Sequence, residues 1–99
     1  MAKKNYIFIE TLCLHYQVDE PFFEALQHAG LVEILDQEGA KYVQQEKLSE
    51  LEKMIRLHQE LNLNIEGIDV VMNLLDRIKL LQKEMNTLKN KLHFGEIGE

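Results

Sequence analysis

Residues 64–94 have the sequence NIEGIDVVMNLLDRIKLLQKEMNTLKNKLHF, and this stretch decides the fold. From Val71 onward its apolar residues recur at alternating steps of three and four, at Val71, Leu74, Ile78, Leu81, Met85, Leu88 and Leu92. Such a heptad seam is typical of a helix that packs along a second helix. Asn64 is suited to cap the start of this helix, and Gly95 is suited to end it just past Phe94.

A helix of about 30 residues is roughly 45 Å long at a rise of about 1.5 Å per residue. The residues that precede it are too few to cover this length. We therefore expect the first half of the helix to pack into its own domain and the second half to meet a second copy of the chain. A helix that packs wholly on its own domain is the alternative. The expected dimerisation residues are Leu74, Ile78, Leu81, Met85, Leu88 and Leu92.

The seam leaves the orientation of the two helices open. Glu84 and Lys91 both occupy the heptad position g and suit an antiparallel pair, whereas Glu84 with Lys89 suits a parallel pair.

The net charge of −6 is unevenly distributed along the chain. Residues 5–40 contain seven carboxylates and neither Lys nor Arg. Residues 77–91 are basic instead, with Arg77 and four lysines against Glu84. Weak nucleic-acid binding by this basic end stays open.

Shorter elements precede the long helix. We expect a helix over residues 10–16 and a second over residues 19–29, with Asp19 as its cap and Pro21 in its first turn. Residues 31–35 and 40–43 are expected to form a hairpin, and residues 44–61 a third helix. The fold class predicted is mainly α, a winged helix-turn-helix with a small two-stranded wing and a long dimerising C-terminal helix. Residues 1–99 form one domain, with the helix-turn-helix and wing over 7–43 and a helical hairpin with its seam over 44–94.

Composition and motifs argue against an enzyme. The four histidines are scattered, none has a Cys or carboxylate at metal-ligand spacing, and the chain has no glycine-rich phosphate loop. We expect no catalytic residue, metal or cofactor, and we interpret Cys13 as core filler. A single Cys and the absence of long apolar runs favour a soluble cytoplasmic protein with no membrane contact.

The layout raises the alternative of a transcriptional regulator that binds DNA. A recognition helix needs Lys or Arg for phosphates and guanine edges. The candidate recognition helix, residues 19–29, contains three carboxylates and no basic residue. Such a surface repels a duplex, so the sequence predicts no sequence-specific DNA binding by this helix.

The order of elements resembles the MerR-like superfamily, in which a helix-turn-helix and wing precede a dimerising helix. More closely, the chain resembles the CbpM family of bacterial chaperone modulators. The residues that carry this resemblance are 12–15 (LCLH), 30–33 (GLVE) and above all 56–64 (RLHQELNLN). The pattern continues from Gly67 through Leu74, Asp76, Ile78, Leu81, Glu84, Leu88 and Leu92 to Phe94. No segment of it is a catalytic signature.

This resemblance implies a dimer that binds the J-domain of a DnaJ-like co-chaperone of the CbpA type and restrains it. It leaves open whether the effect is inhibition or tethering, and which face meets the partner. An acidic helix-turn-helix suits a basic J-domain surface, and a merely solvated acidic face is the alternative. The candidate contacts are the polar residues expected to be exposed: Glu20, Glu24, Arg56, Glu60 and Asp76. His58 falls on the apolar stripe of its helix and is interpreted as a packed histidine.

Overall fold

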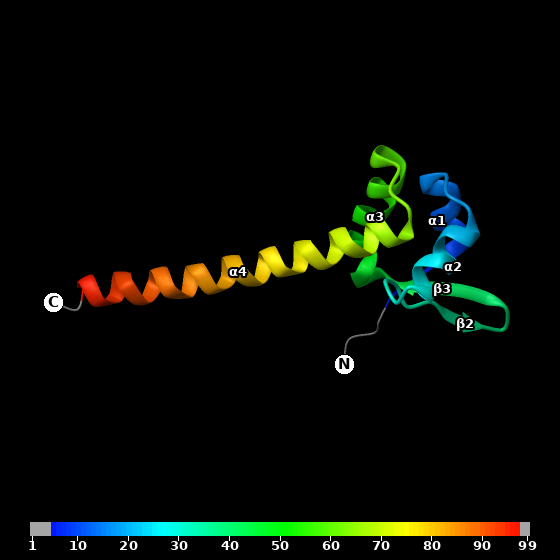
Figure 1. Ribbon diagram of the computed structural model, residues 1–99. Coiled ribbons are helices and arrows are strands. Elements are labelled where there is room, and N and C mark those ends of the chain that lie inside the picture. The colour runs from blue at the N-terminus through cyan, green and yellow to red at the C-terminus, as the bar shows by residue number, and fades with distance from the viewer. Residues whose placement is uncertain (1–4, 98–99) are drawn as a thin grey trace. The chain divides into compact units, whose positions relative to one another are not determined.

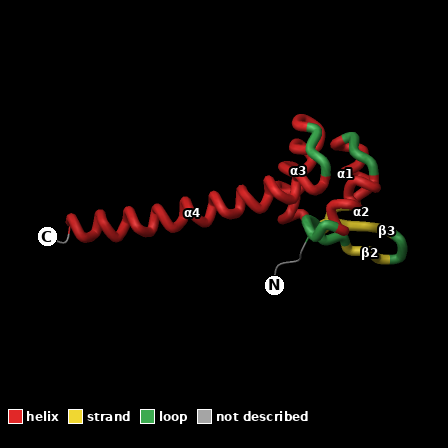
Figure 2. Tube along the Cα trace, in the orientation of Figure 1, coloured by secondary structure: helices red, strands yellow, loops and turns green. Residues whose placement is uncertain are grey.

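The structure is a computed structural model that describes residues 5–97, with side chains described for residues 5–93. Its elements are β1 (Tyr6–Phe8), α1 (Ile9–Tyr16), α2 (Glu20–His28), β2 (Leu35–Gln37), β3 (Ala40–Gln44), the 3-10 turn η1 (Gln45–Lys47), α3 (Leu48–Leu61) and α4 (Ile65–Ile97). Figures 1 and 2 label the four α-helices and the hairpin strands β2 and β3. The contacts divide the chain into two compact units, Met1–Asp69 and Val70–Glu99, called here the N-terminal and C-terminal units. The predicted fold class is confirmed, because the chain is mainly helical with a small sheet and a long C-terminal helix.

The helix-turn-helix is defined by its turns. Gln17 takes a left-handed conformation with φ 57°, which ends α1. Asp19 then caps α2 as predicted, since its Oδ1 accepts a hydrogen bond from the backbone N–H of Phe22 at 3.3 Å. Pro21 stands in the first turn, where a missing N–H costs nothing.

The wing has one strand more than predicted. The sheet order is β1-β3-β2, and both pairings are antiparallel. Tyr42 of β3 stands opposite Leu35 on one side and Phe8 on the other. Residues 6–8 thus form a true strand, because β3 offers a second edge for their backbone groups.

The predicted strand over residues 31–35 is wrong except at its last residue. Leu31 donates its N–H to the carbonyl of Leu26 at 2.9 Å, so it belongs to the cap that ends α2. The strand instead includes Asp36 and Gln37, and the turn is confined to Glu38 and Gly39. Both turn residues have positive φ, 53° and 86°, as a two-residue hairpin of type I′ requires.

A single apolar core holds the N-terminal unit together. It draws side chains from three helices, from β3, from the loop before β2 and from the first turn of α4. Its members are Ile9, Leu12, Phe22, Phe23, Leu26, Ile34, Val43, Leu51, Met54, Ile55 and Ile68. Ile68 is fully buried, so the first turn of α4 belongs to this core, whereas the prediction placed the whole first half of the helix there.

The third and fourth helices differ from the prediction at their ends. The predicted helix over residues 44–61 is wrong at its start, because Gln44 ends β3, residues 45–47 form η1 and α3 begins only at Leu48. Asn64 caps α4 as predicted, with its Oδ1 accepting from the N–H of Gly67 at 2.8 Å. Gly95 does not end α4, which continues to Ile97. A glycine weakens a helix by about 1 kcal/mol, and it ends the helix only where the backbone adopts a capping conformation.

Gly67 lies close to this cap. A Cβ at residue 67 would stand 3.2 Å from Asn64 Oδ1 and 3.5 Å from the side chain of Leu63. Gly67→Ala alone is therefore expected to change the free energy of unfolding little. Its gain in helix propensity, about 1 kcal/mol, is offset by disturbance of a cap that contributes about 0.5–2 kcal/mol.

In an Asn64→Ala background the same Gly67→Ala change should stabilise the protein by about 1 kcal/mol, because no cap remains to disturb. Urea denaturation of the wild type, both single variants and the double variant measures this coupling. Equal effects of Gly67→Ala in the two backgrounds would contradict the close contact with the cap.

Candidate partner-binding site

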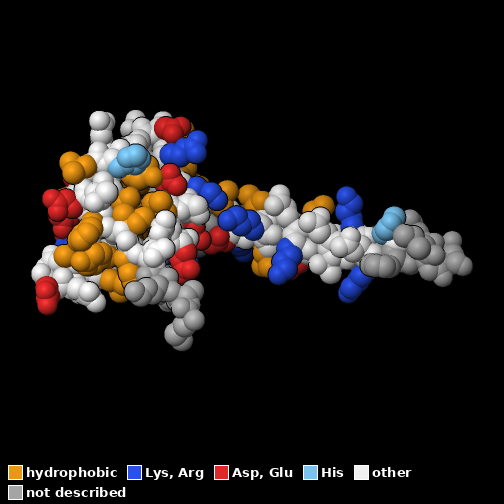
Figure 3. All heavy atoms as spheres, turned by 180° about the vertical axis from the view of Figure 1, so that it is seen from behind, with side chains coloured by type: hydrophobic (Ala, Val, Ile, Leu, Met, Phe, Trp, Pro, Cys, Tyr) orange, Lys and Arg blue, Asp and Glu red, His pale blue; other side chains and the backbone are white. Residues whose placement is uncertain are grey.

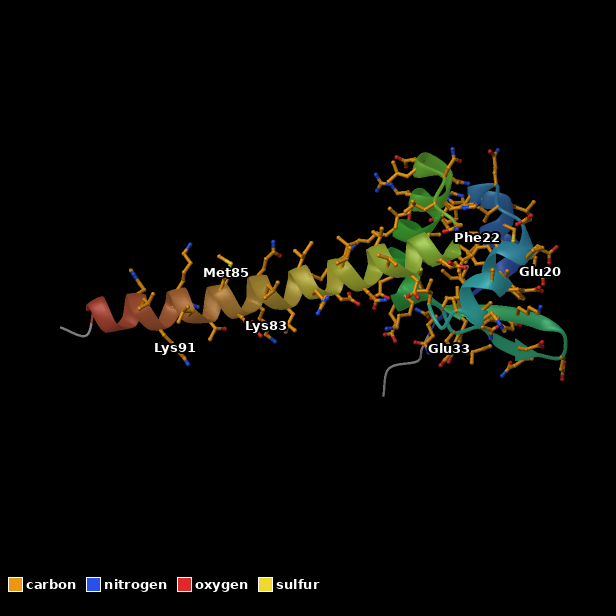
Figure 4. All side chains as sticks on the ribbon, viewed as in Figure 1. Glu20, Phe22, Glu33, Lys83, Met85 and Lys91 are labelled. Atoms are coloured by element: carbon orange, nitrogen blue, oxygen red, sulfur yellow. The ribbon has the colours of Figure 1, made fainter. Side chains whose placement is uncertain are left out.

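The two candidate contacts on α2 are joined by one cation. Glu20 and Glu24 are a helical turn apart, and both carboxylates pair with the Nζ of Lys41 on β3, at 3.2 Å and 3.1 Å. Figure 4 shows Glu20 on α2 beside the sheet. The hydrogen bonds to Glu24 and then to Glu20 raise the pKa of Lys41, so its ammonium stays charged at neutral pH. We call this pairing of Lys41 with Glu20 and Glu24 the Lys41 clamp. The sequence did not predict it, although Lys41 is the first Lys or Arg after residue 4.

The segment 56–64, which carries the strongest resemblance, has an inner and an outer face. On the inner face His58 stacks on Phe22 with ring centroids 4.6 Å apart, and its Nδ1 lies 3.0 Å from the carbonyl oxygen of Leu63. The side-chain amide of Gln59 donates to the carbonyl of Tyr16 at 2.7 Å. The interpretation of His58 as a packed histidine is confirmed. These contacts fasten the end of α3 to the helix-turn-helix.

On the outer face Arg56 and Glu60 form an ion pair. The Nε of Arg56 lies 3.3 Å from Oε2 of Glu60, and the two side chains are 73% and 63% exposed. An exposed pair at this helical spacing stabilises a helix by about 0.3–0.5 kcal/mol. Their contribution to folding is therefore small, and both groups are accessible to a partner.

The C-terminal unit carries Asp76 and the seam. Asp76 is exposed, and the six predicted dimerisation residues Leu74, Ile78, Leu81, Met85, Leu88 and Leu92 are 49–64% exposed. Val70 and Leu80 are exposed as well, and the heptad pattern did not include them. Figure 3 shows Lys and Arg side chains along this part of the helix. The unit thus presents apolar and basic side chains together.

The five candidate contacts fall into separate groups. The structure brings Glu20 and Glu24 together through Lys41, and it pairs Arg56 with Glu60 on a different helix. Asp76 belongs to the C-terminal unit. The sequence pattern predicted exposure for each of the five, and each one is exposed.

The described residues give little support for a reactive cysteine, a metal site or a membrane-spanning helix. Burial raises the pKa of the Cys13 thiol, and the carboxylates of Glu20, Asp19 and Glu10 raise it further, which disfavours a reactive thiolate. Among the described side chains, no three His, Cys, Asp or Glu groups could hold a metal ion. None of the helices within residues 5–97 is both long and apolar enough to cross a membrane.

Comparison with known proteins places this arrangement in a family. Residues 7–90 match the family described as MerR HTH family regulatory protein. The chain belongs to this MerR family. It is also 28% identical over 85 residues to a chaperone modulatory protein CbpM of Pseudomonas entomophila (strain L48), a match that covers 85% of this chain and 84% of that protein. The comparison with solved structures found no match. The matched family is regulatory and the relative is a chaperone modulator, and neither is an enzyme family.

Substitutions on the inner face of the segment 56–64 should lower the free energy of unfolding more than substitutions on its outer face. His58→Ala removes the stack on Phe22 and the hydrogen bond to Leu63, and each contact contributes about 0.5–1.5 kcal/mol. We therefore expect a loss of about 1–3 kcal/mol in the free energy of unfolding. The matched control is Glu60→Ala, two residues further along the same helix on its outer face, and it should change the free energy of unfolding by less than about 0.5 kcal/mol. Urea denaturation giving the two variants equal stability would contradict this division of the helix.

Proposed function

We propose that this MerR-family protein is a non-enzymatic modulator in the cytoplasm. It binds the J-domain of a DnaJ-like co-chaperone of the CbpA type and restrains that co-chaperone's stimulation of Hsp70. The observation that carries the proposal is the acidic helix-turn-helix, which has no Lys or Arg from residue 5 to residue 40. The resemblance to the CbpM family and the relative's name, chaperone modulatory protein, supply the partner.

Charge gives the proposal a physical route. The J-domain surface that reaches Hsp70 is expected to be basic, and a modulator with carboxylates there competes for the same cations. Complementary charge speeds encounter and fixes orientation more than it adds affinity. The proposed contacts are Glu20, Glu24, Arg56, Glu60 and Asp76, all exposed. Blocking alone lowers chaperone turnover, so no chemical step is needed.

The family description keeps DNA-binding regulation as the second candidate. In a helix-turn-helix, α2 is the element that would enter the major groove. Its charged side chains are Glu20 and Glu24, and the one cation that reaches them, Lys41, is held between them. A duplex would meet carboxylates at this helix, so the surface favours a cationic protein over DNA.

Self-association is the second part of the proposal. A contiguous row of exposed apolar side chains on a soluble helix marks an interaction site. The heptad spacing from Leu74 to Leu92 fits the same seam of a second copy, because the spacing is what knobs-into-holes packing requires. Each dimer would then carry two J-domain-binding sites, one on each chain.

The decisive measurement is ATP hydrolysis by Hsp70 stimulated by the J-domain protein, with and without this protein. Saturating wild type should lower the stimulated rate toward the unstimulated one. Glu20→Lys with Glu24→Lys should weaken J-domain binding at least tenfold and restore the rate, because the contacts would then repel a basic surface. Lys41→Gln should tighten binding, since it releases both carboxylates.

Glu46→Lys is the matched control, since it reverses an exposed carboxylate outside the candidate set. It should leave the inhibition within about twofold of wild type, apart from a small long-range charge effect. If wild type at saturation changes neither the ATPase rate nor the NMR spectrum of the J-domain, the proposed function is wrong.

Dimerisation is tested by placing charge in the seam. Leu81→Asp with Leu88→Asp should give a monomer or an aggregate, because two carboxylates cannot be buried between apolar helices without large cost. Asn86→Asp with Asn90→Asp adds the same charge to the same helix off the seam, and should keep the dimer. Sedimentation equilibrium reads the mass directly, and a wild-type monomer at high concentration would rule the seam out.

A further inference from the structure

The sheet of the N-terminal unit presents aromatic side chains to solvent. Tyr6 and Phe8 of β1 are 45% and 49% exposed. Phe8 stands opposite Tyr42 in the register, their ring centroids are 4.6 Å apart, and Leu35 stands on the other side of Tyr42. Figure 3 shows hydrophobic side chains gathered on one face of this unit. We call Tyr6, Phe8, Tyr42 and Leu35 the aromatic face.

Strand alternation separates this face from the core. Successive side chains point to opposite faces of a sheet, so Ile7 and Val43 lie on the other side from Phe8 and Tyr42. Val43 is 1% exposed and belongs to the apolar core. Lys41, also on that other side, reaches Glu20 and Glu24 of α2. The aromatic face is therefore the outer face of the wing.

The described charged residues within two positions of the three strands are all carboxylates apart from Lys41, and Lys3 and Lys4 precede β1 outside the described residues. Lys41 is the single cation among the residues of the three strands, and it points to the opposite face. Glu10 follows Phe8 by two residues, and Glu33 precedes Leu35 by two residues on the loop shown in Figure 4. Both carboxylates are exposed. Two aromatic rings in contact, with exposed carboxylates close by in the sequence and no cation on the same face of the described strands, suit the binding of a cationic side chain.

We propose that the aromatic face is a docking surface for an Arg- or Lys-bearing segment of the partner protein. A cation of that segment would lie over the rings of Phe8 and Tyr42, and its aliphatic part would cover Leu35 and Tyr6. Glu10 and Glu33 would attract the segment and orient it. Aromatic side chains that contact a guanidinium are among the groups that dominate protein interfaces. This inference rests on the proposed function, because it adds an apolar anchor to the J-domain site.

A second copy of the chain is a poorer occupant. Each copy has a net charge of −6, and two aromatic faces brought together would oppose Glu10 and Glu33 to their own counterparts. Neither copy would bring a cation from its strands to the rings. The seam of the C-terminal unit already offers a second copy an apolar surface of the right spacing. The aromatic face is thus better matched to a basic protein than to itself.

Isothermal titration of the CbpA-type J-domain into the full-length protein tests the proposal. Phe8→Ala should weaken binding at least tenfold, which corresponds to about 1.4 kcal/mol. Phe8→Leu keeps an apolar side chain but has no π face, and should weaken binding by about three- to tenfold, whereas Phe8→Tyr should bind as wild type does. The matched control is Leu14→Ala, which removes an apolar side chain 78% exposed on α1 and should change affinity less than twofold.

Each outcome separates the two proposals. If wild type binds and Phe8→Ala matches Leu14→Ala, the aromatic face is not a docking surface while the proposed function stands. If wild type does not bind the J-domain at all, the proposed function is wrong.

The Phe8 variants test the cation contact itself. Phe8→Leu with wild-type affinity would reject the cation contact. Should Phe8→Ala unfold by circular dichroism, the comparison of Phe8→Leu with Phe8→Tyr decides. A change of mass in sedimentation of Phe8→Leu would point instead to a second copy and overturn the proposal.

Discussion

Joint burial of apolar side chains from six places along residues 9–68 is the interaction on which the N-terminal unit depends. Neither α1, with eight residues, nor α2, with nine, is long enough to be stable alone, because isolated helices below about 12–15 residues are marginal in water. The sheet is similarly dependent, since short strands need a packed face. Phe23 and Leu26 are fully buried on α2, and Ile68 brings the first turn of α4 into the same core. The helix-turn-helix, the wing and the start of the long helix therefore form together.

A core of this kind leaves the outer residues free to vary. The side chains of the core are apolar and buried, whereas Arg56 and Glu60 of α3 are exposed and their ion pair adds little to stability. The same MerR architecture can thus present a basic recognition helix to DNA or an acidic one to a protein, and fold alone does not decide between them. In this chain α2 carries Glu20 and Glu24 and no Lys or Arg, and the proposal of a protein partner rests on that surface.

Local signals predicted much of the fold, and the errors arose both from a distant strand pairing and from local caps that the sequence pattern did not reveal. The caps of α2 and α4 were predictable because Asp19 and Asn64 each bond a backbone N–H three residues ahead. Strand β1 was not, since three residues become a strand only by pairing with β3, some 35 residues later. Leu31 carries a strand-like sequence, but its N–H completes the cap of α2. The candidate site residues were predictable as exposed groups, whereas the Lys41 clamp depends on the folded sheet.

That clamp changes the meaning of the acidic composition. Of the seven carboxylates within residues 5–40, Asp19 caps α2, Asp36 accepts the N–H of Gly39, and Glu20 and Glu24 share Lys41. The side chains of the other three, Glu10, Glu33 and Glu38, make no hydrogen bond or ion pair with another described residue. All three adjoin the strands: Glu10 follows β1, Glu33 precedes β2, and Glu38 lies in the hairpin turn. The carboxylates without a partner among the described residues thus adjoin the strands in the sequence, and the same sheet exposes the rings of Tyr6 and Phe8. Long-range attraction and short-range apolar contact then act at the same surface, which is the arrangement expected of a site that captures a basic segment.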